Sequence, residues 1–276
     1  MTDEEVIHLR PSEQEALPED FQLRVQLCEQ LASFVSPRRL ERLEFALAHR
    51  TRWITVALED VFQTHNASAI LRSCDCFGVQ DVHVVDERNE YTIHRQIALG
   101  AAQWLDLYRH TGADSAEAVD RCCKSLKSSG YRLVATTPHE GATDLDDVDV
   151  GRGPMALLFG TEYTGLTEVA MDHVDEAIRI PIVGFTESLN VSVSAALILK
   201  QLTTSLRNRG DVDGRLSESE QVDIRLAWLR RSMRHGEAII RRFLTDNGVE
   251  PVTSETGEVG PQQIVPDVDI DEVADI

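Results

Sequence analysis

Small polar side chains recur in three short segments of this 276-residue chain, each beside an apolar run. The segments are NASAILR (66–72), LFGTEYTGL (158–166) and IPIVGFTESLNVSVSAA (180–196). In α/β proteins, ligands bind where parallel strands end, because main-chain amides and short polar side chains converge there. The polar side chains within the three segments include Asn66, Arg72, Glu162, Ser188 and Asn190. Of these, Arg72 lies inside an otherwise small and apolar helix and could be aimed at an anion.

Each of these residues also has a purely structural interpretation. Asn66 and Ser188 could serve only as helix N-caps, and Glu162 could brace a loop at the start of a helix. Arg72 could lie at the rim of an otherwise small and apolar helix. Asn190 is harder to explain in this way, because it interrupts an apolar run.

Several common motifs are missing from the sequence. It has no G-x-G-x-x-G after a strand, no P-loop, no H-E-x-x-H and no G-x-S-x-G. Five cysteines without a C-x-x-C pair fit core packing in a reducing compartment better than disulfides or zinc. The usual dinucleotide, triphosphate, zinc and hydrolase chemistries therefore lack support.

The elements that must position the polar segments alternate between strand and helix patterns. Strand patterns cover 53–61, 81–86, 105–110, 131–136, 154–159 and 177–182, with helical patterns between them. This alternation predicts an α/β fold with a mostly parallel sheet. Ser188 is expected to cap a helix over 189–202, which would bring the third segment to a helix N-terminus.

The predicted organisation has five parts. They are a disordered acidic arm (1–20), N-terminal helices (21–52), the α/β domain (53–210), C-terminal helices (211–248) and a disordered acidic tail (249–276). No run of about 18 apolar residues occurs, and the N-terminus lacks the apolar core of a signal peptide. We therefore expect a cytoplasmic protein that does not span a membrane.

The net charge of −20 argues at first sight against a nucleic-acid partner. The charge is concentrated at the ends, because 249–276 carry −8 and 1–20 carry −6, which leaves only −6 on 21–248. Arginine outnumbers lysine 24 to 3, and arginines gather in 38–52 and 225–242. These clusters indicate either solvated helix faces or surfaces that meet RNA or a second subunit. The acidic, lysine-poor composition also suggests adaptation to high salt.

Taken together and in order, the three segments resemble the SPOUT superfamily of knotted RNA methyltransferases. More narrowly, residues 36–245 are similar to the TrmH-type tRNA (guanosine-2′-O)-methyltransferases. The resemblance implies a Rossmann-like parallel sheet with a C-terminal deep trefoil knot that holds S-adenosylmethionine. It also implies a homodimer with its active site at the subunit interface, tRNA as substrate at the 2′-hydroxyl of guanosine 18, and no metal.

The resemblance assigns roles to individual residues. The catalytic set is Arg72, Asn66, Glu162, Ser188 and Asn190. The cofactor-binding set is Thr136, Gly160, Ile180 and Leu189. The RNA-binding set is Arg50, Arg52, Arg207 and Arg209, although Arg207 and Arg209 lie about three residues later than in typical members. The alternatives are a 23S rRNA 2′-O-ribose methyltransferase of the same fold and a catalytically silent RNA-binding protein.

Overall fold

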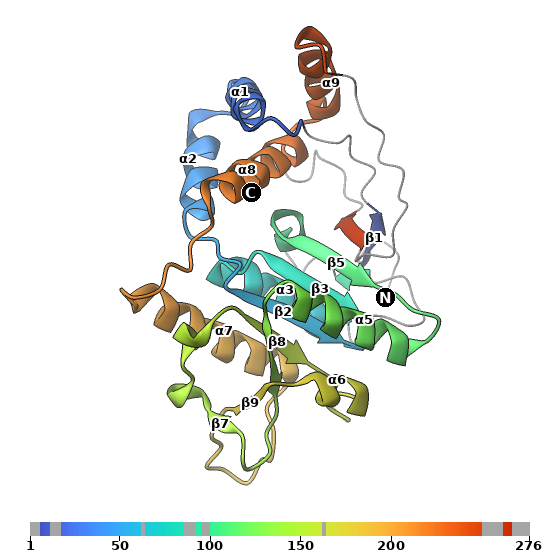
Figure 1. The fold of residues 1–276 in the computed structure, drawn as a ribbon, viewed down its shortest axis with the longest axis vertical. Coiled ribbons are helices and arrows are strands. Elements are labelled where there is room, and N and C mark those ends of the chain that lie inside the picture. The colour runs from blue at the N-terminus through green and yellow to red at the C-terminus, as the bar shows by residue number, and fades with distance from the viewer. Residues whose placement is uncertain are drawn as a thin grey trace. The chain divides into compact units, whose positions relative to one another are not determined.

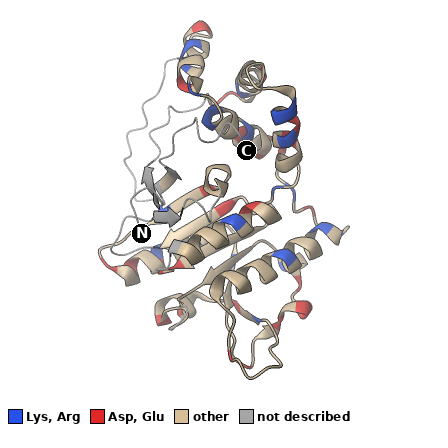
Figure 2. Ribbon diagram, turned by 180° about the vertical axis from the view of Figure 1, so that it is seen from behind, with Lys and Arg blue, Asp and Glu red and all other residues tan. Residues whose placement is uncertain are grey.

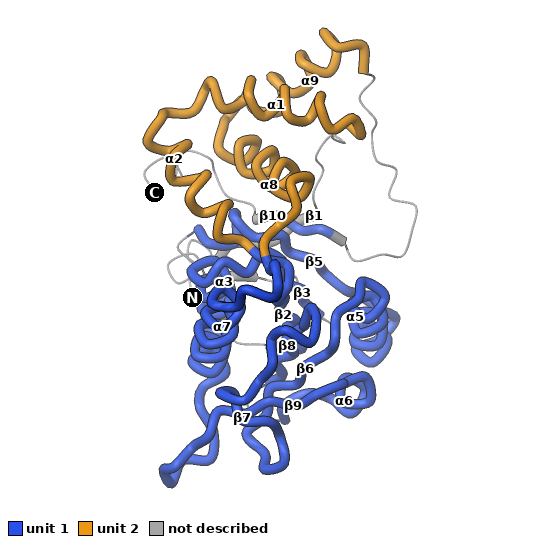
Figure 3. Tube along the Cα trace, turned by 60° about the vertical axis from the view of Figure 1, so that its left-hand side comes forward, with its two compact units in different colours: residues 1–11, 51–214, 260–267 blue, residues 12–50, 215–259, 268–276 orange. Residues whose placement is uncertain are grey.

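The computed structural model describes residues 6–11, 18–61, 64–85, 92–94, 100–161, 164–249 and 262–266. The chain forms two compact units, which Figure 3 distinguishes by colour. Unit 1 comprises 1–11, 51–214 and 260–267, and unit 2 comprises 12–50, 215–259 and 268–276. The helices predicted before and after the α/β domain thus belong to one unit.

Unit 1 is built on a ten-stranded sheet of order β4-β1-β10-β5-β3-β2-β8-β6-β9-β7. Seven neighbouring strands, from β5 to β7 in that order, pair in parallel. They are β2 (Ile54–Glu59), β3 (Asp81–Val85), β5 (Asp106–His110), β6 (Arg132–Thr136), β7 (Thr143–Asp144), β8 (Met155–Phe159) and β9 (Glu176–Arg179). The predicted α/β class and parallel sheet are confirmed, whereas the knot stays a prediction from the family resemblance.

The two faces of the sheet are covered by different helix pairs (Figure 1). The helices are α3 (Thr64–Phe77), α5 (Ser115–Ser128), α6 (Glu168–His173) and α7 (Val191–Asn208). Helices α3 and α7 pack together, and α5 packs on α6 and on strands β3 and β6. Burial on both faces explains why β8 is apolar throughout, since every one of its residues is buried.

Strands were not predicted in the terminal segments, where we expected disorder. In these segments Val6–Pro11 form β1 and Gln262–Pro266 form β10. A further short strand, β4 (Thr92–His94), lies within the chain. Strand β10 pairs antiparallel with both β1 and β5, and Ile264 is only 3% exposed. Strand β10 thus lies between β1 and β5 in the sheet, where Ile264 of the acidic tail is buried. The disorder that we expected for the rest of the arm and tail stays a prediction.

Unit 2 is a helical unit made from two distant stretches of chain. Its helices are α1 (Phe21–Ala32), α2 (Pro37–Leu47), α8 (Glu218–Arg231) and α9 (Gly236–Asp246). Helix α8 packs against the other three, with Trp228 1% exposed at the core. Ser36 caps α2 by accepting from the Arg39 amide, and Pro37 occupies the first turn, as predicted.

The long helix of the third segment begins later than we predicted. Helix α7 starts at Val191, and its N-cap is Asn190 rather than Ser188. The Asn190 side-chain oxygen accepts from the Ser192 amide at 2.9 Å, which satisfies a free amide of the first turn. Among the described residues, no helix is long and apolar enough to cross a bilayer.

Candidate functional site at the carboxyl ends of the parallel strands

Three of the four predicted cofactor-binding residues follow neighbouring strands of the sheet. Thr136 ends β6, Gly160 comes directly after β8, and Ile180 comes directly after β9. The Thr136 hydroxyl donates to the Leu158 carbonyl at 2.9 Å, which ties β6 to β8. Because β6 lies between β8 and β9, the three residues share the carboxyl edge of the sheet.

This edge is also a point where the chain changes direction across the sheet. From β2 the chain continues to β3 on one side, whereas from β8 it continues to β9 on the other. Ligands in open α/β sheets bind beyond the strand ends at such a point. The topology therefore selects the same edge as the polar sequence segments.

Gly160 permits a loop that closes tightly on itself. A Cβ atom at this position would lie 2.3 Å from the carbonyl group of Gly165. The amides of Thr161 and Gly165 each donate to the other residue's carbonyl at 3.1 Å, and Gly165 has a φ of 70°. Glu162 lies within this loop but outside the described residues. Glycine is needed at position 160 because the Gly165 main chain occupies the space that a side chain would take.

The structure brings together two catalytic candidates that are far apart in sequence. The Asn190 side-chain amide donates to the Asn66 side-chain oxygen at 3.2 Å. Asn66 lies in the first turn of α3 and is only 5% exposed, so this amide pair joins the N-termini of α3 and α7. Two helix N-termini converging beside a pair of amides favour a ligand with negative or partly negative oxygens.

Arg72 lies less than two turns further along α3 and is exposed. It forms no hydrogen bond or ion pair with any residue in the described part of the chain. A guanidinium held on a helix without a carboxylate partner remains available to an anion, such as a phosphate or an oxyanion.

The segment 181–190, which contains Ser188 and Leu189, is exposed throughout. Val183 and Phe185 are 103% and 109% exposed, which is unusual for large apolar side chains. Two of the predicted site residues, Ser188 and Leu189, therefore lie on an exposed segment of the chain.

One buried acidic residue was missed at the sequence level. Glu59 ends β2 and is 5% exposed, and one of its oxygens accepts from the Thr167 amide at 3.2 Å. Burial raises the pKa of Glu59, although its bonds to Thr167 oppose the shift. A carboxylate at the end of the apolar run WITVALE was the available signal. Through Thr167, Glu59 holds the start of α6, directly after the Gly160 loop.

The four predicted RNA-binding arginines have different surroundings. Arg50 is 4% exposed and its guanidinium lies over the Trp228 ring, 5.0 Å from the centroid. Arg209 pairs with Asp149 and, at 2.7 Å, with Asp211. Arg207 is exposed, and it donates to the Phe77 carbonyl at 2.6 Å.

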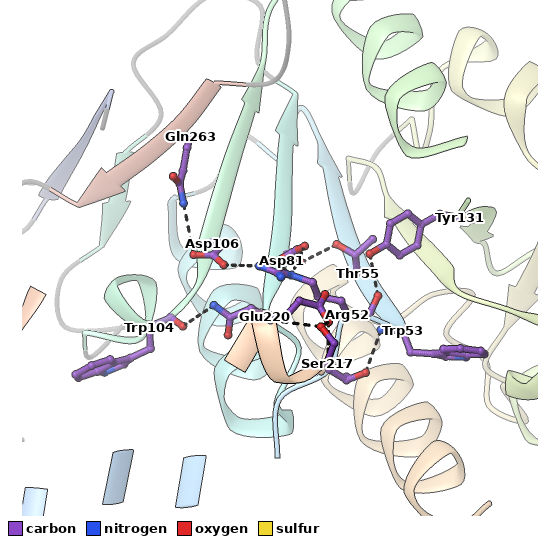
Figure 4. A network of polar contacts seen from close by, with 12 residues as sticks. Arg52, Trp53, Thr55, Asp81, Trp104, Asp106, Tyr131, Ser217, Glu220 and Gln263 are labelled. Atoms are coloured by element: carbon purple, nitrogen blue, oxygen red, sulfur yellow. Dashed lines mark hydrogen bonds and ion pairs between the residues drawn. The ribbon is translucent and has the colours of Figure 1, made fainter. Parts of the chain in front are cut away.

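Arg52 is part of an ion-pair network at the opposite, amino-terminal edge of the strands (Figure 4). Its Nε donates to both oxygens of Asp81 at 3.1 Å, and its Nη2 donates to Asp106 at 3.0 Å. The Tyr131 hydroxyl donates to the Arg52 carbonyl at 2.8 Å. Burial opposes the charge, but Asp81 and Asp106 raise the pKa of Arg52. The charge of Arg52 is thus compensated within the fold, and RNA contacts of Arg50, Arg52 and Arg209 stay predictions.

No group of His, Cys, Asp and Glu in the described ranges is arranged to hold a metal ion. All five cysteines are free, and only Cys76 is exposed. The site that the described residues form is therefore one of main-chain amides, side-chain amides and hydroxyls.

The fold and this edge define an α/β protein whose ligand site lies beyond the ends of parallel strands. Residues 53–200 match the model of the SpoU rRNA Methylase family. The chain belongs to this family.

Relatives and a solved structure extend the comparison. The chain is 35% identical over 209 residues to the tRNA (guanosine(18)-2′-O)-methyltransferase of Borreliella burgdorferi, covering 76% of this chain and 92% of the relative. It is 37% identical over 198 residues to the enzyme of that name from Thermus thermophilus, covering 70% and 96%. The crystal structure of the Aquifex aeolicus TrmH/SpoU tRNA modifying enzyme aligns with a TM-score of 0.57 at 25% identity, covering 77% of this chain and 98% of that chain.

Proposed function

We propose that the protein transfers a methyl group from S-adenosylmethionine to the 2′-hydroxyl of guanosine 18 in tRNA. The observation that carries the proposal is the Asn66–Asn190 amide pair, which joins two helix N-termini beside the loop that Gly160 closes. The similarity to enzymes of this name over nearly their whole length supports tRNA as the substrate.

The cofactor site that we propose fits the residues on the carboxyl edge of the sheet. Gly160 allows the loop after β8 to close on itself, while Thr136 ends β6 and Ile180 follows β9 at the same edge. We place the cofactor against these residues and Leu189. An adenosine offers an apolar face and polar edges, which suits amides flanked by aliphatic groups. When bound, S-adenosylmethionine supplies a methyl group that its sulfonium has already activated.

The chain's own residues then have to position the ribose. Arg72 binds the phosphate beside the target and stabilises the negative charge that develops on the 2′-oxygen. It does not act as the base, because a guanidinium stays protonated in proteins. The 2′-proton leaves through the neighbouring phosphate or a water, and the donor leaves as S-adenosylhomocysteine. Asn66, Asn190, Ser188 and Glu162 orient the ribose and its neighbours. Alignment of the hydroxyl supplies much of the rate, since the methyl donor needs no further activation.

The proposal includes a homodimer. Val183 and Phe185 on the exposed segment, together with Val193 and Leu197 on one side of α7, form an apolar surface that a second copy would cover. The exposure of segment 181–190 in one subunit is what a site completed by a partner would show. We place the reaction in the cytoplasm, with Arg207 as an RNA contact.

Labelled S-adenosylmethionine tests the proposal when it is incubated with unmodified tRNA and, separately, with 23S rRNA. Ribose methylation at guanosine 18 is the expected result, mapped as a site that resists alkaline hydrolysis. Methylation of rRNA alone would instead support the rRNA enzyme. Transfer to neither RNA, with RNA binding retained, would support a catalytically silent binding protein.

A further inference from the structure

The carboxyl end of β2 carries an acidic residue in apolar surroundings. Glu59 is the last residue of β2 and is only 5% exposed, and the acidic positions of the chain are red in Figure 2. Its side chain lies on the same face of the sheet as that of Ala57, which packs in a cluster with Cys122 and Leu158. Burial raises the pKa of Glu59, because an ionised carboxyl loses its hydration there. An apolar residue of similar size would therefore be less costly at this position.

The two oxygens of the Glu59 carboxyl group differ in their contacts. Oε2 accepts from the Thr167 main-chain amide at 3.2 Å. Oε1 is buried and has no hydrogen-bond partner in the described part of the chain. No lysine or arginine among the described residues forms an ion pair with Glu59. The contact that offsets the cost of burying this acid is therefore the one with Thr167.

Thr167 is the N-cap of α6, and its own amide needs an acceptor that this helix does not supply. In a capping box, a Glu or Gln at the third helical position accepts that bond. Helix α8 has such a box, because Glu220 accepts from the Ser217 amide at 2.7 Å. The third residue of α6 is Ala170, which has no side-chain acceptor. The acceptor comes instead from Glu59, 108 positions earlier in the chain, so the start of α6 is tied to strand β2.

This bond closes the base of the loop that joins β8 to α6, residues 160–167. The paired residues of β2 and β8 run up to Leu58 and Phe159. One further step along both strands places Glu59 beside Gly160, because parallel strands advance together. Glu59 is thus next to the first residue of the loop and hydrogen-bonded to the last.

The interior of the same loop is held by short-range bonds. Thr161 and Gly165 each donate an amide to the other's carbonyl at 3.1 Å, and the Thr164 amide donates to the Thr161 hydroxyl oxygen at 3.1 Å. A compact loop of this kind keeps its own shape, and its place on the sheet is set where it leaves and rejoins the regular elements. A shift at the start of α6 would therefore move the main chain of the loop as a unit.

We propose that Glu59 is a positioning residue for the cofactor, which closes the base of loop 160–167 and so fixes the main chain against which S-adenosylmethionine binds. It acts through Thr167 and touches neither the methyl group nor the RNA. The inference rests on the proposed function, in which this loop is one wall of the cofactor site. Ligand sites need such support from behind, because a wall that moves loses the affinity that its geometry gives.

Two variants of the full-length protein test the role of the Glu59 acceptor, with the dissociation constant of S-adenosylmethionine measured by titration calorimetry. Glu59→Ala is expected to weaken binding about tenfold, because the Thr167 amide loses its acceptor. Glu59→Gln restores most of the affinity, since its amide oxygen accepts the same bond. In steady-state kinetics, Glu59→Ala is expected to raise the KM for S-adenosylmethionine and to leave the KM for tRNA unchanged. Unaltered affinity in Glu59→Ala, or an equal loss in Glu59→Gln, would overturn the inference.

Thr167→Pro removes the same bond from its other end, because proline has no amide hydrogen. The φ of Thr167 is −67°, which proline adopts without strain. Thr167→Ala is the matched control, since it loses the cap hydroxyl but keeps the amide. We expect Thr167→Pro to weaken cofactor binding about tenfold and Thr167→Ala to bind nearly as well as the unaltered protein. Adding Glu59→Ala to Thr167→Pro should cause no further loss, and a second tenfold loss would contradict a shared bond.

A carboxylate at the opposite, amino-terminal edge of the strands separates positioning from general stability. Asp175 accepts from the Leu133 amide at 2.8 Å, so Asp175→Ala is expected to lower the thermal midpoint and to leave cofactor affinity unchanged. Without cofactor, hydrogen exchange in peptides covering 158–170 is expected to be faster in Glu59→Ala, with β3 and β5 unaffected. An equal loss of affinity in Asp175→Ala, or faster exchange throughout unit 1, would make Glu59 a general stabilising residue and overturn the inference.

The outcome is separable from that of the proposed function. If Glu59→Ala keeps full cofactor affinity while the unaltered protein methylates guanosine 18, only the inference about Glu59 fails. If cofactor affinity depends on Glu59 and on the Thr167 amide but no methyl group reaches tRNA, only the proposed function fails. If the unaltered protein does not bind S-adenosylmethionine, both fail.

Discussion

Two arginines of unit 1 stand in opposite surroundings. Arg52, at the amino-terminal edge of the parallel strands, donates to Asp81 and Asp106 and receives a hydrogen bond on its carbonyl from Tyr131. Arg72, on α3, is exposed and pairs with no described carboxylate. Arg52 precedes strand β2, and Arg72 follows it on α3. From the sequence, Arg52 was predicted to bind RNA and Arg72 to act in catalysis.

The difference separates a residue that holds the sheet together from one that is free to meet a ligand. A partly buried cation that is paired with two buried carboxylates stabilises the fold only while all three groups are present. An exposed guanidinium contributes little to folding and retains its charge for a substrate. We therefore expect changes at Arg52 to affect stability, and changes at Arg72 to affect turnover.

The largest expected effect is on catalysis. Arg72→Lys keeps the positive charge but loses the planar fork that binds a phosphate in two places. Single-turnover methyl transfer is expected to slow by about 10²-fold or more, with the cofactor affinity and the thermal midpoint unchanged. Turnover like that of the unaltered enzyme would remove Arg72 from the mechanism.

The second expected effect is on stability. Arg52→Ala leaves Asp81 and Asp106 next to each other without a cation, so the free energy of unfolding in urea is expected to fall by about 3 kcal/mol. Arg152→Ala serves as the control, because Arg152 is 60% exposed in its pair with Glu176, and a loss below about 1 kcal/mol is expected. Equal losses in the two variants would show that the network does not act as a unit.

A smaller effect is expected at the loop after β8. Gly160→Ala places a methyl group against the Gly165 carbonyl, so the loop must shift. We expect S-adenosylmethionine to bind about tenfold more weakly in calorimetric titrations, which corresponds to about 1.4 kcal/mol. Gly210→Ala is the matched control, since nothing lies within 4 Å of its added Cβ and it lies outside the segments assigned to the cofactor. A similar loss in both variants would place the cofactor elsewhere.

The last expected effect is absent at neutral pH and concerns acid stability. His83 and His110 are buried side by side, with 2.9 Å between Nδ1 of the first and Nε2 of the second. Burial lowers the pKa of both rings, and His110 lowers that of His83 further. The unfolded chain then binds more protons below about pH 6.5, so stability is complete above this pH and falls as acid is added, by about 1.4 kcal/mol per pH unit for each ring.

Denaturant titrations between pH 7 and about pH 5 measure this fall. Replacing His83 and His110 together with Gln should flatten the curve. If the curve keeps its slope in that variant, carboxylates rather than the histidine pair account for the acid sensitivity.

Local patterns were sufficient for most of unit 1. The run PMALLF became β8 because a strand buried on both faces needs apolar residues at every position. Asn66 and Asn190, however, meet across 124 positions of the sequence, and no local pattern contains that contact. The ion pairs of Arg52 were not foreseen for the same reason, since its two carboxylate partners come from the separate strands β3 and β5.

Helix caps and terminal strands mark the other limit of sequence reasoning. Ser188 and Asn190 are both residue types that favour the N-cap position. The sequence alone could not show that the helix begins after Asn190, two residues later than predicted. Strand β10 was not predicted because QQIVP has little periodicity of its own, and it becomes a strand by pairing with β1 and β5.

Strand β10 is the last element to be synthesised, so both of its partner strands are made before it. Strand β5 leaves the ribosome long before β10, and β1 is made first of all but has to wait for the same partner. Until then, a row of unpaired amides and carbonyls on β5 is open to other nascent chains.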